Sequence, residues 1–132
     1  MTKIIRKYLS SFEKLNITKI DDLLDCVDEK IFFSDPFHTI SGKKKFRNVL
    51  LQMFDVIKKP KFKIINLSNN KNLYYVKWSF SGFYKKEFSF VGISEIEIKN
   101  SLITKHIDFW DSGRNFYSKL PLVGSIFRKF HK

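Results

Sequence analysis

Residues 31–42 of the chain read IFFSDPFHTISG, and this stretch joins two kinds of sequence pattern. Ile31-Phe32-Phe33 predicts a short strand, which ends at Asp35-Pro36 because proline lacks the backbone donor of a ladder and restricts the residue before it. Ser41-Gly42 then opens a helix. Before this stretch the apolar residues recur at helical spacing, whereas beyond the helix that follows it they alternate with polar ones. Helices are therefore expected first and strands afterwards.

Three helices are predicted around this stretch. Residues 3–15 place apolar side chains on one helical face, with mostly charged side chains between them. A second helix is expected over residues 19–27, since Thr18 and Asp21 suit a helix start. The third helix runs from Ser41-Gly42 through Lys58 and ends at Lys59-Pro60.

After Pro60 the apolar period changes to two, which predicts strands over 61–68, 73–81, 86–98 and 102–110. This order of elements indicates an α+β domain, with helices on one face of a curved antiparallel sheet and a pocket between them. The residues expected to share a face are Tyr74, Val76, Trp78 and Phe80 on one strand, and Leu102, Thr104, His106, Asp108 and Trp110 on the last.

Length and composition limit the class of protein. A chain of 132 residues is expected to form one domain over 1–132, and 17% aromatic content argues against disorder. The single cysteine, Cys26, excludes a disulfide framework and a cysteine-based zinc site. Residues 1–9 carry charges without a continuous apolar run, and no stretch approaches 18 apolar residues. A cytoplasmic protein is therefore expected.

The net charge of +12 raises the question of nucleic-acid binding. Only four of the 25 basic residues are Arg, the residue type that reads guanine and phosphate by paired hydrogen bonds. Lysines on solvated faces account for most of the charge, so a nucleic-acid partner is not expected.

The tail, residues 113–132, is basic and amphipathic. It either packs on the fold or a protein partner, or lies on an anionic membrane surface.

Four features resemble the nuclear transport factor 2-like superfamily, in particular its SnoaL-like and ketosteroid-isomerase-like branch. They are, in order, Asp35-Pro36-Phe37, Gly42 before a helix, Val76-Lys77-Trp78 in a strand, and Phe109-Trp110-Asp111, in which the aromatic pair ends the last strand and an acid follows. The resemblance covers about residues 3–112. It implies a cone-shaped, cystatin-like α+β fold, whose curved antiparallel sheet wraps around the N-terminal helices. It also implies an interior pocket and a homodimer through the outer sheet face, and a short helical tail is expected after this core.

The resemblance also implies site residues. In ketosteroid isomerases the Asp of Asp-Pro-Phe is the general base, and Asp35 holds that position here. The Tyr and Asp of their oxyanion hole fall at Ser11, one turn from Tyr8, and near Ser94, so this pair of donors is not matched.

Other enzymatic members resemble the chain at its last strand. In limonene-epoxide-hydrolase-like members the last acid of the triad corresponds to Asp108, but the Arg and the first Asp are absent from residues 75–78. SnoaL-like cyclases are similar in using one acid on the last strand, again near Asp108. The resemblance therefore favours isomerase- or cyclase-like acid–base chemistry without a metal or cofactor.

Asp35, His106 and Asp108 are the candidate catalytic residues. A desolvated Asp35 would suit a base, but the same residue before proline also suits a turn whose backbone N–H groups it binds. His106 and Asp108 lie roughly 7 Å apart along one strand face. They form either an acid–base pair or a buried polar pair satisfied by its neighbours. His38 is expected in an exposed loop or at the pocket rim.

Two functions remain open. In the first, the chain binds a small hydrophobic carbonyl ligand and, if it is an enzyme, also transforms it. In the second, it is a non-catalytic dimeric module whose tail contacts a membrane or a protein partner. The histidines and acids match no zinc spacing, so no metal is expected. The expected pocket lining is Phe12, Phe32, Phe37, Trp78, Phe80, Phe90, Ser94 and Trp110.

Overall fold

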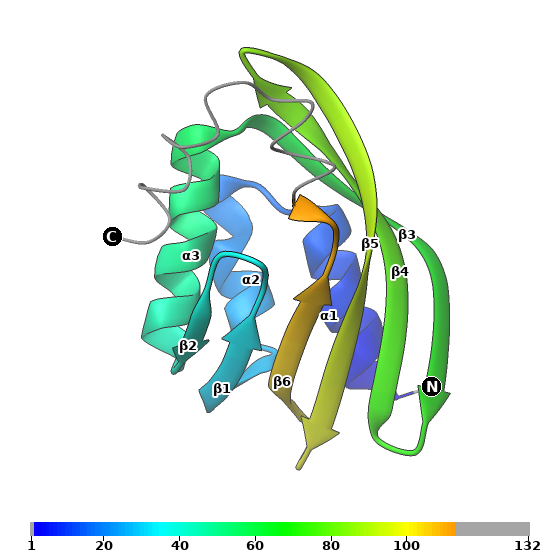
Figure 1. The fold of residues 1–132 in the computed structure, drawn as a ribbon. Helices are drawn as coiled ribbons and strands as arrows, with labels where there is room; N and C mark the ends of the chain where they lie inside the picture. The colour runs from blue at the N-terminus through cyan, green and yellow to red at the C-terminus, as the bar shows by residue number, and fades with distance from the viewer. Residues whose placement is uncertain (1, 113–132) are drawn as a thin grey trace.

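Helices α1, α2 and α3 pack against the concave face of a curved six-stranded sheet in the computed structural model, which describes residues 2–112 (Figure 1). The α+β class is confirmed, and the predicted tail, residues 113–132, lies outside the described residues. The elements are α1 (Lys3–Glu13), the 3-10 helix η1 (Ile17–Lys19), α2 (Ile20–Leu24), β1 (Val27–Ser34), β2 (Thr39–Ser41), α3 (Lys43–Val56), β3 (Lys58–Asn70), β4 (Leu73–Tyr84), β5 (Lys86–Lys99) and β6 (Leu102–Phe109).

The sheet is mixed rather than wholly antiparallel. Its strand order is β2-β1-β6-β5-β4-β3, so β2 and β3 form open edges. The pairs β1–β2, β6–β5, β5–β4 and β4–β3 are antiparallel, but β1 and β6 run parallel. The path of the chain explains this pairing. Strand β1 enters the sheet before α3, and β6, the last strand, lies next to β1. Local sequence patterns do not report this long-range pairing.

Strand β1 is longer than expected and the second helix is shorter. The helix ends at Leu24, and the strand begins at Val27, four residues before the predicted Ile31. The backbone N–H of Ile103 in β6 donates to the carbonyl of Cys26 at 2.9 Å, so pairing with β6 takes this segment out of the helix. The short strand β2 was not predicted. Pro60 lies inside β3, where an edge strand tolerates it.

A β-bulge in β6 changes which of its residues face inward. Ile98 pairs with Ile103 but Glu97 pairs with Lys105, which leaves Thr104 as the extra residue of the bulged strand. Ile103 is buried, whereas Leu102 and Thr104, the residues predicted for that face, are only half-buried. Beyond the bulge the predicted alternation holds, and His106 lies on the inner face opposite Ile96.

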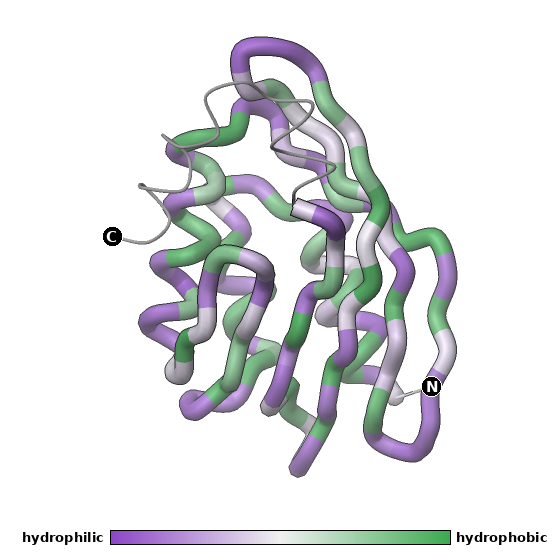
Figure 2. Tube along the Cα trace, in the orientation of Figure 1, coloured by the Kyte–Doolittle hydropathy of each residue, from purple (hydrophilic) through white to green (hydrophobic). Residues whose placement is uncertain are grey.

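The core lies between the helices and the inner face of the sheet. Alternation along β4 buries every second residue from Tyr74 to Phe80, as the sequence predicts, and β5 does the same from Phe88 to Ile98. Figure 2 shows this alternation of hydrophilic and hydrophobic residues along the strands. Within residues 2–112, no helix has the length and apolar character needed to cross a membrane.

Candidate functional site

A cavity of about 110 Å³ lies between the helices and the inner face of the sheet. It is close in size to an engineered protein cavity of roughly 150 Å³ that holds benzene. Most of its wall is apolar. Its polar residues are Asp35, His38, Ser94, His106 and Asp108, and its aromatic residues are Phe12, Phe33, Phe37, Phe46, Phe62, Trp78, Phe80, Phe90 and Trp110.

The wall contains all but one of the residues that the sequence suggests for it. Phe32 is the exception, because side chains alternate along β1 and place Phe33 on the inner face instead. The Phe33 ring lies 5.3 Å from the His106 imidazole, measured between ring centroids. The predicted residues that do lie in the wall are Phe12, Phe37, Trp78, Phe80, Phe90, Ser94 and Trp110.

Five side chains, four of them on this wall and Tyr8 behind it, form a continuous hydrogen-bond chain, which we call the Asp108 network. The indole Nε1 of Trp78 donates to Ser94 Oγ at 2.8 Å, and Ser94 Oγ donates to Asp108 Oδ1. His106 Nε2 lies 2.6 Å from the same Asp108 Oδ1. The Tyr8 hydroxyl lies 2.7 Å from His106 Nδ1. His106 and Asp108 are therefore in direct contact, closer than their separation along the strand suggests.

The partners determine the direction of each hydrogen bond in the Asp108 network. An indole N–H only donates, so Ser94 accepts from Trp78 and gives its own proton to Asp108. An ionised carboxylate only accepts, which places a proton on His106 Nε2. Burial, and secondly the charge of Asp108, raise the pKa of Tyr8 well above its ordinary value, so its hydroxyl keeps a proton that it can donate to His106 Nδ1. In this arrangement of protons the imidazole is neutral and Asp108 carries the negative charge.

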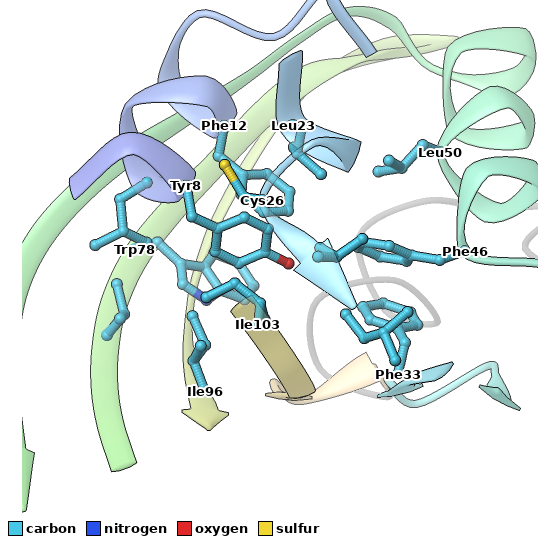
Figure 3. Close-up of a cluster of buried hydrophobic side chains, with 14 of the residues drawn as sticks. Tyr8, Phe12, Leu23, Cys26, Phe33, Phe46, Leu50, Trp78, Ile96 and Ile103 are labelled. Atoms are coloured by element: carbon cyan, nitrogen blue, oxygen red, sulfur yellow. The ribbon is translucent and has the colours of Figure 1, made fainter. Parts of the chain in front are cut away.

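Four elements bring the Asp108 network together, since its tryptophan lies on β4. Tyr8 reaches inward from α1 and is completely buried, with its ring edge-to-face with Phe12 at 5.1 Å. Figure 3 shows Tyr8 among Phe12, Trp78 and Phe46, with its hydroxyl pointing away from the helix. Asp108 on β6 and Ser94 on β5 are cross-strand partners. The inner-face alternation of the strands thus places both residues on the cavity wall.

Gly92 makes room for the indole of Trp78. The two residues are cross-strand partners on β5 and β4. A Cβ at position 92 would lie 2.5 Å from Cζ2 of Trp78 and 3.1 Å from the carbonyl oxygen of Phe109. Only a residue without a side chain lets the indole lie across β5 and direct its N–H toward Ser94.

Asp35 holds the turn that follows β1 and also lines the cavity. Its Oδ1 accepts from the backbone N–H of Phe37 at 2.8 Å and of His38 at 2.7 Å. His38 Nδ1 lies 2.9 Å from Oδ1 and 3.1 Å from Oδ2. The side chains of His38 and Asp35 are only 6% and 13% exposed, so the interpretation of His38 as an exposed loop residue is wrong. The turn buries it, because its ring is held against the Asp35 carboxylate.

Tyr8 is the site residue that sequence reasoning missed. Counting back from Asp35 without gaps pointed to Ser11, but the Ser11 hydroxyl donates to the carbonyl of Lys7 at 2.8 Å on the helix surface. Tyr8 lies on the buried stripe of α1, where an aromatic residue looks like ordinary core. Its hydroxyl is the one signal that could have singled it out, because a buried tyrosine usually finds a hydrogen-bond partner.

The other chemically reactive groups are less suited to catalysis. Cys26 is buried, and burial raises the pKa of its thiol, which keeps it protonated and a poor nucleophile. Between residues 2 and 112, no three His, Cys, Asp or Glu side chains gather closely enough to hold a metal ion.

Comparison with known proteins agrees with this geometry. Residues 5–106 match the SnoaL-like domain family. No curated protein shows a significant match to the sequence. A hypothetical protein with a ketosteroid isomerase-like fold from Catenulispora acidiphila, solved with trimethylamine, has a TM-score of 0.76 at 11% identity, with 89% of this chain and 92% of that chain covered.

Two further solved structures share the fold. A proposed polyketide cyclase from Xanthomonas campestris has a TM-score of 0.71 at 12% identity, with 84% of this chain and 90% of that chain covered. An LEH-like epoxide hydrolase from M. tuberculosis has a TM-score of 0.73 at 13% identity, with 94% of this chain and 92% of that chain covered. At these identities the likeness concerns the fold alone.

Proposed function

Because the chain belongs to the SnoaL-like domain family, we propose that its cavity binds a compact hydrophobic carbonyl ligand and that Asp108 exchanges a proton with it. The observation that carries the proposal is the carboxylate of Asp108 in the wall of a mostly apolar cavity that is rich in aromatic residues. Such a group is placed to act as a base on a ligand from which water is excluded.

Asp108 suits the role of base better than Asp35. Both hydrogen bonds of Asp108 go to Oδ1, from Ser94 and His106, and the side chain is 19% exposed. Within residues 2–112 its Oδ2 has no hydrogen-bond donor and is therefore placed to meet a ligand. In Asp35 both oxygens contact His38, and Oδ1 also accepts two backbone N–H groups. Those contacts occupy both carboxylate oxygens, so we assign Asp35 to holding the turn at the cavity wall.

The proposed step is a proton transfer. Asp108 Oδ2 takes a proton from the carbon next to the carbonyl, and the electron pair of the broken C–H bond moves toward the carbonyl oxygen. The proton then returns to another atom of the same ligand, which amounts to an isomerisation or the proton-transfer part of a cyclisation. Tyr8 and His106 keep the carboxylate in place through their hydrogen bonds during both transfers.

The solved structures that share the fold include a proposed polyketide cyclase and an LEH-like epoxide hydrolase, so the fold is compatible with an enzyme without specifying the reaction. The hydrolase route lacks support in this chain, because residues 75–78 of β4 contain neither the Arg nor the Asp of that triad.

The experiment is the exchange of ketone protons for deuterium. Cyclopentanone and cyclohexanone are incubated with the protein in D2O, and NMR measures the loss of protons next to the carbonyl. We expect the wild type to accelerate the exchange and Asp108→Asn to reduce it by about 100-fold. Asp25→Asn, which changes an exposed carboxylate, serves as the matched control and keeps the wild-type rate. Exchange at the buffer rate with a ketone that binds the wild type contradicts the proposal.

A homodimer is the second part of the proposal, and the outer face of the sheet supports it. Val91, Ile93 and Phe109 are 47%, 45% and 57% exposed there, and Ile93 is the cross-strand partner of Phe109. A contiguous apolar strip on a solvent-facing sheet suits association with a second copy. In the non-catalytic alternative this face would be the functional surface. The proposed membrane or partner contact of the tail lies outside the described residues.

A further inference from the structure

We propose that the ligand of the cavity carries a positively charged nitrogen, as in a small aliphatic amine or quaternary ammonium compound. The inference rests on the proposed function for the place of the ligand, beside Asp108, and adds the charge by which the site would select it. Three features of the wall support it: its charged residues, its rings and its size.

The titratable lining residues are two carboxylates and two histidines, and each carboxylate contacts one histidine, Asp35 with His38 and Asp108 with His106. Asp35 and Asp108 line the cavity, and the lining residues that the structure describes include neither Lys nor Arg. This is unexpected in a chain with a net charge of +12, where basic residues are abundant. His106 does not compensate Asp108, because a neutral imidazole is the form that accepts from the Tyr8 hydroxyl. A protonated His106 would leave the Tyr8 hydrogen without an acceptor among residues 2–112.

An unpaired carboxylate in apolar surroundings is costly, and a cationic ligand would supply the missing partner. Asp108 already has two hydrogen-bond donors, Ser94 and His106, but both are neutral groups. A ligand ammonium beside the Asp108 carboxylate would form an ion pair with little competition from water, since the side chain is only 19% exposed. A neutral ligand of the same shape would leave the carboxylate of Asp108 without a positively charged partner.

The aromatic rings of the wall suit the same kind of ligand. Both tryptophans of the chain line the cavity. Trp110 stacks on Phe90 with centroids 4.7 Å apart and meets Phe37 edge-on at 5.3 Å. Aromatic faces, those of tryptophan most strongly, attract cations, and proteins recognise quaternary ammonium groups with cages of such rings. Aromatic rings and a carboxylate that line the same cavity would distinguish an ammonium ion from an uncharged group.

The size of the cavity restricts the cation to a small one. A volume of about 110 Å³ suits a group near the size of a single ring or a trimethylammonium headgroup. A long, flexible polyamine would not fit inside it. The proposal therefore concerns compact ammonium compounds whose charged group is buried.

The test compares choline with 3,3-dimethylbutan-1-ol, which has the same shape but a carbon in place of the charged nitrogen. Isothermal titration calorimetry on the full chain is expected to show choline binding at least about tenfold more tightly. In Asp108→Asn the ratio of the two affinities is expected to fall toward one, whereas Asp25→Asn keeps it. Trp110→Leu should weaken choline binding more than binding of the alcohol. Near-ultraviolet circular dichroism checks that each variant is folded.

The inference is overturned if the alcohol binds as tightly as choline, or if Asp108→Asn leaves the ratio unchanged. Its failure is distinguishable from that of the proposed function. Deuterium exchange of ketones without a preference for choline would reject only the charge of the ligand. A preference for choline that depends on Asp108, without ketone exchange, would reject only the proton transfer. If neither choline nor a ketone binds the wild type, both proposals fail.

Discussion

The hydroxyl of Tyr8 ends the chain of hydrogen bonds that leads through His106 to Asp108. It favours the neutral form of the imidazole, because a protonated imidazole would leave the hydroxyl proton without an acceptor among residues 2–112. The charge of Asp108, on which both proposals depend, is thus set partly by a residue on another element. Single atoms of the Asp108 network can be removed with little change in shape, which makes the network testable residue by residue.

Tyr8→Phe removes the hydroxyl but keeps the ring in its contacts with Phe12 and His106. It leaves His106 Nδ1 buried without its donor, so we expect a loss of about 1–3 kcal/mol in the free energy of unfolding. Urea denaturation measures it. Tyr75→Phe, on a tyrosine 37% exposed on the opposite face of β4, should change stability by less than about 0.5 kcal/mol. Equal effects of the two substitutions would count against the network.

Stability is expected to fall in alkaline solution. Burial raises the pKa of Tyr8 and, less strongly, that of Cys26, so the folded protein retains protons that the unfolded chain releases. Above the pKa that each of these groups has in the unfolded chain, the free energy of unfolding therefore decreases as pH rises. For Tyr8 the decrease approaches about 1.4 kcal/mol per pH unit.

Urea denaturation between pH 8 and pH 11 checks this dependence. Tyr8→Phe should lower the slope above pH 10, and Cys26→Ala should lower it from about pH 9. Tyr75→Phe should keep the wild-type slope. An unchanged slope in Tyr8→Phe would mean that the phenol ionises equally well in the folded and unfolded states.

The pairing of β4 with β5 is the local arrangement on which the cavity wall depends. Trp78, Ser94 and Gly92 lie on these two strands and act together, since the glycine admits the indole whose N–H binds the serine. On β6, the bulge at Thr104 resets the alternation so that Ile103 and His106 are both buried. Without the extra residue, only one of them would face the core.

Gly92→Ala tests the arrangement of these strands. The added methyl group would lie 2.5 Å from the Trp78 ring, so the indole must move and its hydrogen bond to Ser94 should break. We expect a loss of about 1–3 kcal/mol in stability. Tryptophan fluorescence and near-ultraviolet circular dichroism should change as well. Ser89→Ala, on the solvent face of the same strand, is the control and should behave as wild type.

For the whole molecule, the parallel pairing of β1 with β6 brings the Asp35 turn and the Asp108 network to the same cavity. Phe33 pairs with His106 in this register. The same sheet turns its other face outward with the apolar strip of Val91, Ile93 and Phe109. The fold thus separates an inner face suited to a ligand from an outer face suited to a second copy.

Ile93→Lys tests the proposed homodimer. Sedimentation velocity should show the wild type as a dimer, and the variant as a monomer, because a charge in the centre of the apolar strip opposes its burial. The fold should be retained, since Ile93 is 45% exposed. Ile65→Lys, on a residue of β3 that is 49% exposed, is the matched control and should remain dimeric. A monomeric wild type at micromolar concentration would contradict the proposal.

The sequence by itself determined the kinds of element and most of the inward-facing residues. A helical period of 3.6 and a strand period of two are local properties, so α1, α3 and the strands from β3 onward were predicted close to their observed bounds. The resemblance to a family with Asp-Pro-Phe drew attention to Asp35 and to the acid on the last strand. It did not indicate what those side chains would contact.

Only the tertiary structure decided the parallel pairing of β1 with β6, the inward position of Phe33, and the assembly of the Asp108 network. Tyr8 and His106 are 98 residues apart in the chain, yet their side chains share a hydrogen bond. Local periodicity carries no information about such a contact, because it depends on how the elements pack and on where a bulge shifts a strand. The sequence therefore supplied the chemical groups, whereas their common place in one cavity depended on long-range packing.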